Sequence, residues 1–219
     1  LESKGLTDLI FPEFVPRASN LLAQSFTDNP LFTYILSPRD LESRASFLPK
    51  YFQTLLKAVT LNDGLIVEAD GWKACGVLMR PGCCDFSLWT KWRAGTAGLL
   101  WGVGMQGCMK VNKEINPLTM QCREDILNSQ QYYYLYQIGT LPSARGQGLC
   151  SCILKHFKGM VIREGLGYPI WLEATSEAGK QVYEKAGWKV IGEVMIGKGK
   201  SDDSGNDEEG GEGFKVWGM

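Results

Sequence analysis

The sequence is poor in the residues from which metal centres are built. Its 219 residues include a single histidine, His156, and none of its seven cysteines forms a C-x-x-C pair. Zinc sites are usually assembled from such pairs, so no metal centre is predicted. An odd number of cysteines without this pairing is typical of reduced thiols, and we therefore predict a cytoplasmic protein.

The sequence also lacks an excess of charge and a long apolar run. The net charge is -1, so neither nucleic acid nor a membrane is an expected partner. The least charged stretch, residues 94–109, is interrupted by glycines and is shorter than the ~20 residues of a membrane-spanning helix. We interpret it as a buried or lid-forming helix. Residues 1–10 carry charges without an apolar core, so no secretory signal peptide is predicted there.

The chain does contain alternating helical and strand-like periodicity. Apolar residues recur at helical spacing over 14–26 and 41–60, and Pro49 is expected to kink or restart the second helix. Two strand-like runs, 65–69 and 72–79, meet at Asp70-Gly71, which is a strong hairpin signal. Further expected elements are an irregular helical region at 85–128, strands at 132–138, 168–174, 188–196 and 213–219, and helices at 149–161 and 177–186. This order predicts one mixed α/β domain over residues 1–219.

Residues 132–165 read as a strand, a glycine-rich turn and a helix. Arg145-Gly146-Gln147-Gly148 opens the helix, whose first N–H groups lack intrahelical partners and point toward one place. The helix dipole adds partial positive charge there, and Arg145 adds a forked cation that matches phosphate oxygens. The pattern therefore predicts a phosphate or pyrophosphate site.

Two common phosphate-binding motifs are excluded at this turn. A Walker-type loop ends in Gly-Lys-Ser/Thr, whereas Gly148 is followed by Leu149-Cys150. The dinucleotide fingerprint G-x-G-x-x-G requires a third glycine where this chain has Ser151.

Residues 138–150 instead resemble the acyl-CoA-binding motif of the GNAT superfamily of N-acetyltransferases, with Cys150 where the family has Gly or Ala. A second block, residues 176–188 (SEAGKQVYEKAGW), resembles the later motif of that family, most closely from Tyr183 to Trp188. The resemblance implies a GNAT-type twisted mixed sheet with splayed central strands, flanked by helices. It further implies that residues 1–130 form a substrate-side region and that residues 131–192 form an acetyl-CoA-binding core.

The resemblance also implies which residues bind the coenzyme. The strand end would pair its backbone with the pantetheine arm, the turn would hold the pyrophosphate, and the start of the later helix would add polar contacts. Lys180 is open to a second interpretation as a solvated lysine. The expected cofactor-binding residues are Ile138, Gly139, Thr140, Arg145, Gly146, Gln147, Gly148, Leu149, Cys150, Ser151, Ser176 and Lys180.

Tyr183 and Glu173 are the candidate catalytic residues implied by the resemblance. A phenol at Tyr183 can protonate the departing thiolate, although a tyrosine here could also pack its helix on the sheet. Glu173 is the nearest candidate for a general base, with a structural hydrogen bond as the alternative. His156 is interpreted as a partly buried helical residue, and Cys150 and Cys152 as small residues at a crowded helix start.

The expected reaction is transfer of an acetyl group from acetyl-CoA to a primary amine of a small molecule, without a metal, by a monomer or homodimer. Two alternatives stay open, which are a protein or peptide N-acetyltransferase and a non-catalytic acyl-CoA-binding sensor. Residues 197–212 are acidic and contain no aromatic or aliphatic side chain. They predict a flexible loop within the last hairpin.

Overall fold

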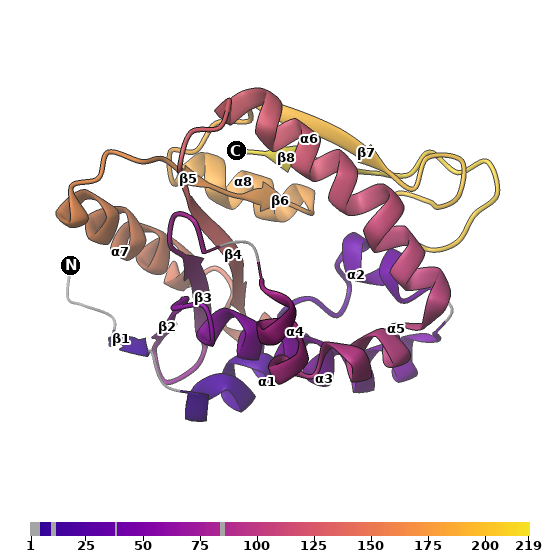
Figure 1. Cartoon of the computed structure of the whole chain (residues 1–219), viewed down its shortest axis with the longest axis horizontal. Helices are drawn as coiled ribbons and strands as arrows, with labels where there is room; N and C mark the ends of the chain where they lie inside the picture. The colour runs from indigo at the N-terminus through magenta and orange to yellow at the C-terminus, as the bar shows by residue number, and fades with distance from the viewer. Residues whose placement is uncertain (1–4, 10–11, 38, 84–85) are drawn as a thin grey trace. The chain divides into compact units, whose positions relative to one another are not determined.

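The computed structural model describes residues 5–9, 12–37, 39–83 and 86–219. Its elements are labelled in Figure 1. The chain divides into two compact units that alternate along the sequence. The first unit comprises Leu1–Ser25, Phe47–Leu99 and Gln131–Trp171, and the second comprises Phe26–Ser46, Leu100–Gln130 and Leu172–Met219. The prediction of a single domain stays a prediction, and each unit is described by itself.

The first unit is built on a five-stranded sheet in the order β1-β2-β3-β4-β5. Neighbouring strands are antiparallel from β1 to β4, and β4 pairs with β5 in parallel. The strands are β1 (Leu6–Leu9), β2 (Leu65–Ala69), β3 (Ala74–Met79), β4 (Tyr133–Thr140) and β5 (Ile170–Trp171).

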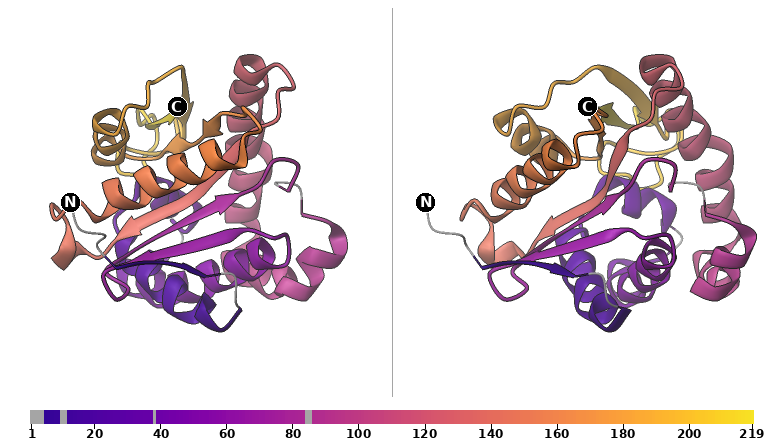
Figure 2. Two further views of the ribbon diagram at one scale, coloured as in Figure 1. Left: turned by 90° about the vertical axis from the view of Figure 1, so that its left-hand side faces the viewer. Right: turned by 60° about the vertical axis from the view of Figure 1, so that its left-hand side comes forward.

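Helices cover both faces of this sheet (Figure 2). Gly76 of β3 lets α7 approach closely, because a β-carbon there would lie 2.6 Å from Ile153 and 2.8 Å from Phe157. On the other face α1 packs against β3 and β4. Tyr133, Phe52 and Phe157 are among the largest fully buried side chains of this core. The helical elements are η1 (Pro12–Phe14), α1 (Val15–Ser25), α4 (Leu88–Ala94), η3 (Pro142–Ala144) and α7 (Leu149–Glu164).

The second unit contains a three-stranded antiparallel sheet in the order β6-β8-β7. The helix α6 packs against β7 and β8, and α8 contacts β6. Its elements are α2 (Pro30–Ile35), the π-helix η2 (Val111–Ile115), α6 (Asn116–Leu127), β6 (Glu173–Ala174), α8 (Glu177–Lys185), β7 (Gly192–Ile196) and β8 (Phe214–Gly218). Two further helices, α3 (Leu41–Thr60) and α5 (Thr96–Lys110), contribute residues to both units.

The mixed α/β class, the 65–79 hairpin and the final hairpin are confirmed. Several details differ from prediction. The helix α3 continues through Pro49, the expected strand 168–174 is split between the two sheets as β5 and β6, and β1 is an additional strand. The expected strand 188–196 begins only at Gly192.

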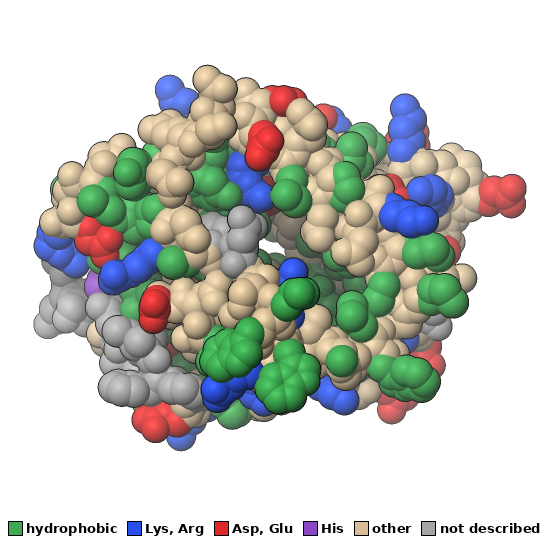
Figure 3. All heavy atoms as spheres, in the orientation of Figure 1, with side chains coloured by type: hydrophobic (Ala, Val, Ile, Leu, Met, Phe, Trp, Pro, Cys, Tyr) green, Lys and Arg blue, Asp and Glu red, His purple; other side chains and the backbone are tan. Residues whose placement is uncertain are grey.

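The buried interpretation of the 94–109 helix is wrong, since α5 exposes most of its large apolar side chains, and the lid-forming interpretation stays a prediction. Trp101 is 90% exposed and Met105 is 78% exposed, whereas Leu99 and Val103 are buried. Apolar side chains of this kind are visible across the face drawn in Figure 3. Among the described residues, no helix combines the length and apolar character needed to span a bilayer.

Candidate functional site

The first group of predicted site residues lies where β4 leads into α7. Gly146 and Gly148 both adopt positive φ, at 79° and 75°, a backbone conformation that favours glycine. Gly148 is the N-cap of α7, and no side chain caps this helix in the part of the chain that is described. The turn around Gly146 and Gly148 is exposed. The first turn of this 16-residue helix therefore begins at an exposed glycine turn without a described side-chain cap, and the positive end of a helix is a suitable place for a phosphate.

Arg145 lies at the mouth of this turn, as predicted. Its Nη2 donates a hydrogen bond to the carbonyl oxygen of Ser25, at the end of α1, over 3.1 Å. The side chain is exposed. A guanidinium carries five N–H donors, so this bond orients Arg145 and leaves donors that could reach a phosphate.

The strand β4 carries the second part of this group. Gly139 pairs with Cys75 of β3, and a β-carbon on Gly139 would lie 2.9 Å from Ser25 and 3.0 Å from Leu22 of α1. A side chain at position 139 would therefore collide with side chains of helix α1. Ile138 is buried and Thr140 is half-buried.

The edge of β4 that faces β5 is paired only near its beginning. The β4–β5 ladder joins Tyr133 to Ile170 and Tyr134 to Trp171, and the rest of β4, including residues 138–140, extends past it. A β-bulge interrupts the β3–β4 ladder on the other edge, because Val77 pairs with Gln137 and Leu78 with Leu135, which leaves Tyr136 as the extra residue.

The side chains at the start of α7 divide into buried and exposed ones. Leu149 is buried in the core and Ser151 is exposed. Burial raises the pKa of the Cys150 thiol to about 12, so the helix dipole does not make it a reactive thiolate. The simpler interpretation of Cys150 as a small packing residue is therefore favoured. His156 is half-buried and lies against Phe157, with ring centroids 6.3 Å apart.

The second group of predicted residues lies on β6 and α8. Ser176 caps α8, since its hydroxyl oxygen accepts a hydrogen bond from the Gly179 N–H over 3.2 Å. Ser176 is therefore the N-cap of α8. Tyr183 is half-buried in the same helix, and its ring edge lies 3.8 Å from where a β-carbon on Gly179 would stand.

Glu173 and Lys180 are engaged in ion pairs. Arg123 of α6 donates to Glu173 Oε1 over 3.2 Å, and the Glu173 side chain is only 10% exposed. Lys180 pairs with Glu177 over 2.8 Å and lies 4.6 Å from the centre of the Trp217 ring. The hydrogen bond to Glu177 raises the pKa of Lys180. These contacts favour the structural alternative for Glu173 and a packed position for Lys180.

Sequence reasoning missed Asn29 as an organising residue of the second unit. Its Oδ1 accepts from the Leu31 N–H over 3.1 Å and caps α2, while its Nδ2 donates to Thr175 Oγ1 over 2.9 Å. Asn29 therefore fixes the start of α2 against the residue that precedes the N-cap of α8. An Asn-Pro pair is a signal for the start of a helix. The contact of Asn29 with Thr175 has no such signal, because the two residues lie far apart in the sequence.

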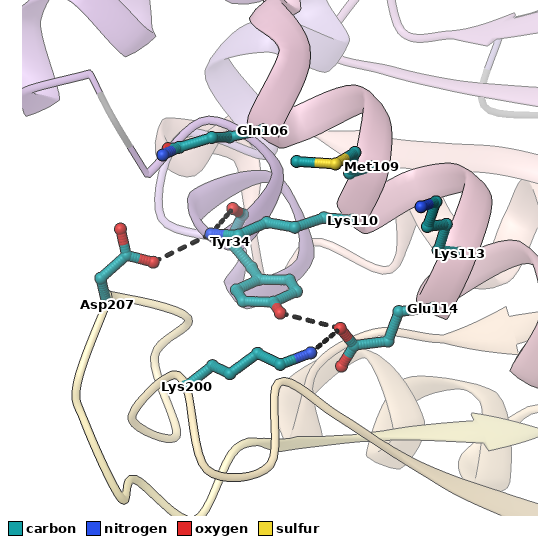
Figure 4. A pocket seen from close by; sticks show the side chains of 8 residues that line it. All are labelled: Tyr34, Gln106, Met109, Lys110, Lys113, Glu114, Lys200 and Asp207. Carbon is teal, nitrogen blue, oxygen red and sulfur yellow. Dashed lines mark hydrogen bonds and ion pairs between the residues drawn. The ribbon is translucent and has the colours of Figure 1, made fainter.

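A polar pocket of about 450 Å³ in the second unit was also missed (Figure 4). On one side, Lys110 Nζ donates to Asp207 over 2.9 Å, to Ser37 over 2.7 Å and to the Tyr34 carbonyl over 3.0 Å. On the other side, Glu114 accepts from the Tyr34 hydroxyl over 3.0 Å and from Lys200 over 2.8 Å. The bonds of Lys110 to Asp207 and of Lys200 to Glu114 attach the acidic loop (residues 197–212) to the region around the π-helix η2.

The pKa values of this network follow from the same contacts. Burial alone would raise the pKa of Glu114, but hydrogen bonds from Lys200, the Gly197 N–H and Tyr34 outweigh it and lower the pKa. Burial and the bond to Glu114 raise the pKa of the Tyr34 phenol. Within the described residues, no group of three His, Cys, Asp or Glu side chains could hold a metal ion.

Comparisons with known proteins identify the fold. No family model matches the chain. An uncharacterized Saccharomyces cerevisiae protein, YDR391C, is 33% identical over 110 residues, which are 49% of this chain and 47% of that protein. The match thus spans about half the length of this curated relative.

Solved structures match nearly the whole chain. A Corynebacterium glutamicum protein described as histone acetyltransferase HPA2 and related acetyltransferase has a TM-score of 0.58 at 21% identity, covering 99% of this chain and 96% of its own. Arylalkylamine N-acetyltransferase 2 of Aedes aegypti has a TM-score of 0.62 at 12% identity, covering 98% of both chains. A Drosophila melanogaster polyamine N-acetyltransferase has a TM-score of 0.54 at 16% identity, covering 98% of this chain and 99% of its own.

The chain has the GNAT fold. The predicted fold class is therefore confirmed. The sequence resemblance implied a strand, a turn and a helix in this region, and β4 and α7 with the turn between them have this order. The roles of the individual site residues stay predictions.

Proposed function

We propose that this protein transfers an acetyl group from acetyl-CoA to a primary amine of a small molecule. The observation that carries the proposal is the exposed turn at Gly146 and Gly148, which follows β4 and η3 and opens α7 without a side-chain cap among the described residues. Such a turn suits the pyrophosphate of a coenzyme. N-acetyltransferases among the structures with the same fold support the reaction type.

In this proposal the backbone of the first unit binds most of the coenzyme. The side chains of Leu149 and Cys150 point into the protein interior, so these residues would contribute their N–H groups, together with Ser151. Arg145 would add a charged hydrogen bond to the pyrophosphate. The edge of β4 at residues 138–140, which extends past the β5 ladder, would pair with the amides of the pantetheine arm.

The proposed chemistry is direct attack of the amine on the thioester. The nitrogen lone pair forms the new C–N bond, the C–S bond breaks, and the sulfur takes a proton from the Tyr183 hydroxyl. The nitrogen releases its proton to water. Holding the two reactants together would supply much of the rate enhancement, and a backbone N–H near Thr140 would polarise the carbonyl.

The contacts of Glu173, Ser176 and Lys180 shape their proposed roles. Because Glu173 already pairs with Arg123, we propose that it orients the β6–α6 region, and that the amine loses its proton to water. Ser176 and Lys180 are retained as coenzyme contacts, although the hydroxyl caps α8 and the ammonium is paired with Glu177.

The test is release of free thiol from acetyl-CoA across a panel of small amines, free amino acids, lysine peptides and N-terminal peptides. The expected result is turnover with a small primary amine. Turnover only with peptides would identify a protein N-acetyltransferase. Coenzyme binding by calorimetry without turnover would identify a sensor, and absence of coenzyme binding would overturn the proposal entirely.

The proposal also covers the acyl donor, the cellular compartment and the oligomeric state. Acetyl-CoA is proposed over longer acyl-CoA molecules, in a cytoplasmic monomer or homodimer. Competition of acetyl-CoA with longer acyl-CoA molecules in the same thiol assay would test the donor, and the expected result is the highest turnover with the acetyl donor.

A further inference from the structure

We infer that the acceptor is an aromatic amine whose ring binds against four side chains of the first unit. These are Phe86, Tyr132, Tyr134 and Tyr136, which we call the aromatic row. The inference rests on the proposed acetyl transfer and narrows the acceptor from any primary amine to one that carries an aryl ring.

The two faces of β4 differ in what covers them. Gly76, on the face that α7 covers, pairs with Ile138, and Leu78 of the same face pairs with Leu135. Tyr133 also belongs to this face, because its hydroxyl donates to Glu164 at the end of α7. Alternation along a strand therefore puts Tyr132 and Tyr134 on the opposite face.

The rings of the aromatic row follow one another edge to face. The Tyr132 and Tyr134 centroids are 6.4 Å apart, those of Tyr134 and Tyr136 are 5.7 Å apart, and Phe86 lies 6.4 Å from Tyr136. The interplanar angles lie between 71° and 86°. An aryl ring that joins the row can adopt the same preferred geometry.

Exposure distinguishes this row from an ordinary core cluster. Tyr133, on the α7 face, is fully buried, whereas all four members of the aromatic row are half-buried. Part of each ring therefore stays accessible to a ligand, and covering it would remove apolar surface from water.

The charge of the strand favours an aryl group over a second cation. From Ile126 to Arg163 the sequence contains no Asp or Glu. A polyamine would bring an additional ammonium to a row whose own four side chains carry no carboxylate to pair with it. A neutral ring needs no such partner.

The position along β4 connects the row to the proposed coenzyme site. Tyr136 is the extra residue of the β-bulge, and Ile138 is two residues further, or about 7 Å along an extended strand. An amine joined to its ring by a short alkyl linker could span that distance to the thioester.

The experiment compares phenethylamine, hexylamine and agmatine as acceptors in the thiol-release assay. The expected result is a kcat/KM for phenethylamine about tenfold above that for hexylamine, in the range of an aromatic pair interaction, with agmatine the poorest. Equal or better turnover of hexylamine or agmatine would overturn the inference while leaving acetyl transfer intact. Absence of turnover with every amine would instead overturn the proposed function.

Variants locate the effect on the row. Tyr134→Leu and Tyr136→Leu are each expected to raise the KM for phenethylamine about tenfold and to leave the KM for hexylamine unchanged. Tyr133→Phe, on the opposite face of the same strand, is the matched control and should change neither. Unchanged acetyl-CoA affinity shows that a variant is folded. If either Tyr134→Leu or Tyr136→Leu fails to fold, the other variant still tests the inference. An equal rise in KM for both amines would contradict binding of the ring at the row.

Discussion

Two glycine-rich segments of this molecule look alike in sequence and differ in structure. Around Gly146 in the first unit the backbone is exposed, and a β-carbon there would meet nothing within 4 Å. In residues 197–213 of the second unit, a β-carbon on Gly205 would lie 2.1 Å from the carbonyl oxygen of Pro30. A positive φ favours glycine at both sites, and lack of space is an additional requirement only at the second.

The difference shows that composition alone does not distinguish a binding turn from a packed loop. The acidic loop bonds to itself and to its surroundings, since Asp202 accepts from the Asn206 N–H over 2.7 Å and Asp207 pairs with Lys110. Ser201 is completely buried. Its flexibility stays a prediction, but its contacts are those of an ordered part of the second unit.

The largest expected effect tests this contrast directly. Gly205→Ala should lower the free energy of unfolding by about 3 kcal/mol, because a positive φ and an overpacked contact both oppose the side chain. Gly146→Ala has only the conformational cost, about 1 kcal/mol. Denaturant unfolding of both variants measures the difference, and equal losses would contradict the distinction.

Tyr183→Phe separates chemistry from binding. If the phenol protonates the thiolate, kcat should fall about 100-fold, while the Kd of acetyl-CoA stays unchanged because other residues make the proposed coenzyme contacts. Single-turnover rates and calorimetry measure the two quantities. An unchanged kcat would reduce Tyr183 to a residue that packs α8.

Arg145→Ala tests the turn of the first unit. Loss of one charged hydrogen bond to the pyrophosphate should weaken acetyl-CoA binding about tenfold. Arg145→Lys keeps the positive charge but not the two parallel N–H donors of a guanidinium, and it should therefore lose less acetyl-CoA affinity than Arg145→Ala. Because kcat at saturating coenzyme should barely change, a variant that lowers kcat at normal affinity would argue against the assignment.

Sequence reasoning succeeded where the signals are local. The glycines at 146 and 148 and the helical patterns from Leu149 and from Glu177 onward each depend on neighbours within a few residues. The predicted start of α7 and both limits of α8 lie within one residue of those observed, whereas α7 continues to Glu164, past the predicted end at residue 161. The same local features also carried the resemblance from which the GNAT fold was predicted.

The features that were missed depend on partners far away in the sequence. The split of 168–174 into β5 and β6 follows from pairing with β4 and β8, and the ion pair of Glu173 requires Arg123 from another helix. Tyr34 and Glu114 are 80 residues apart. Nothing in the local pattern of either residue indicates the other.

Acid should weaken the attachment of the acidic loop, and this is the smallest of the expected effects. The pKa of Glu114 is lowered in the folded protein below its ordinary value of 4.5. The carboxylate therefore stabilises the fold above that value, and the contribution is lost as the pH falls through the folded pKa. Glu114→Gln should lower the free energy of unfolding by about 1 kcal/mol at neutral pH. The free energy of unfolding of this variant should also fall less than that of the original chain between about pH 6 and about pH 3.

The control for this effect lies in the same loop. Glu209 is exposed, so Glu209→Gln should leave both the stability and its pH dependence unchanged. Some acid dependence should persist in Glu114→Gln, because burial opposes ionisation of Asp207 but the bonds from Lys110 and Ser37 still lower its pKa. Unfolding curves recorded at several pH values measure these slopes. If Glu114→Gln and Glu209→Gln behaved alike, the ion pair with Lys200 would contribute nothing measurable, as is common for exposed lysine partners.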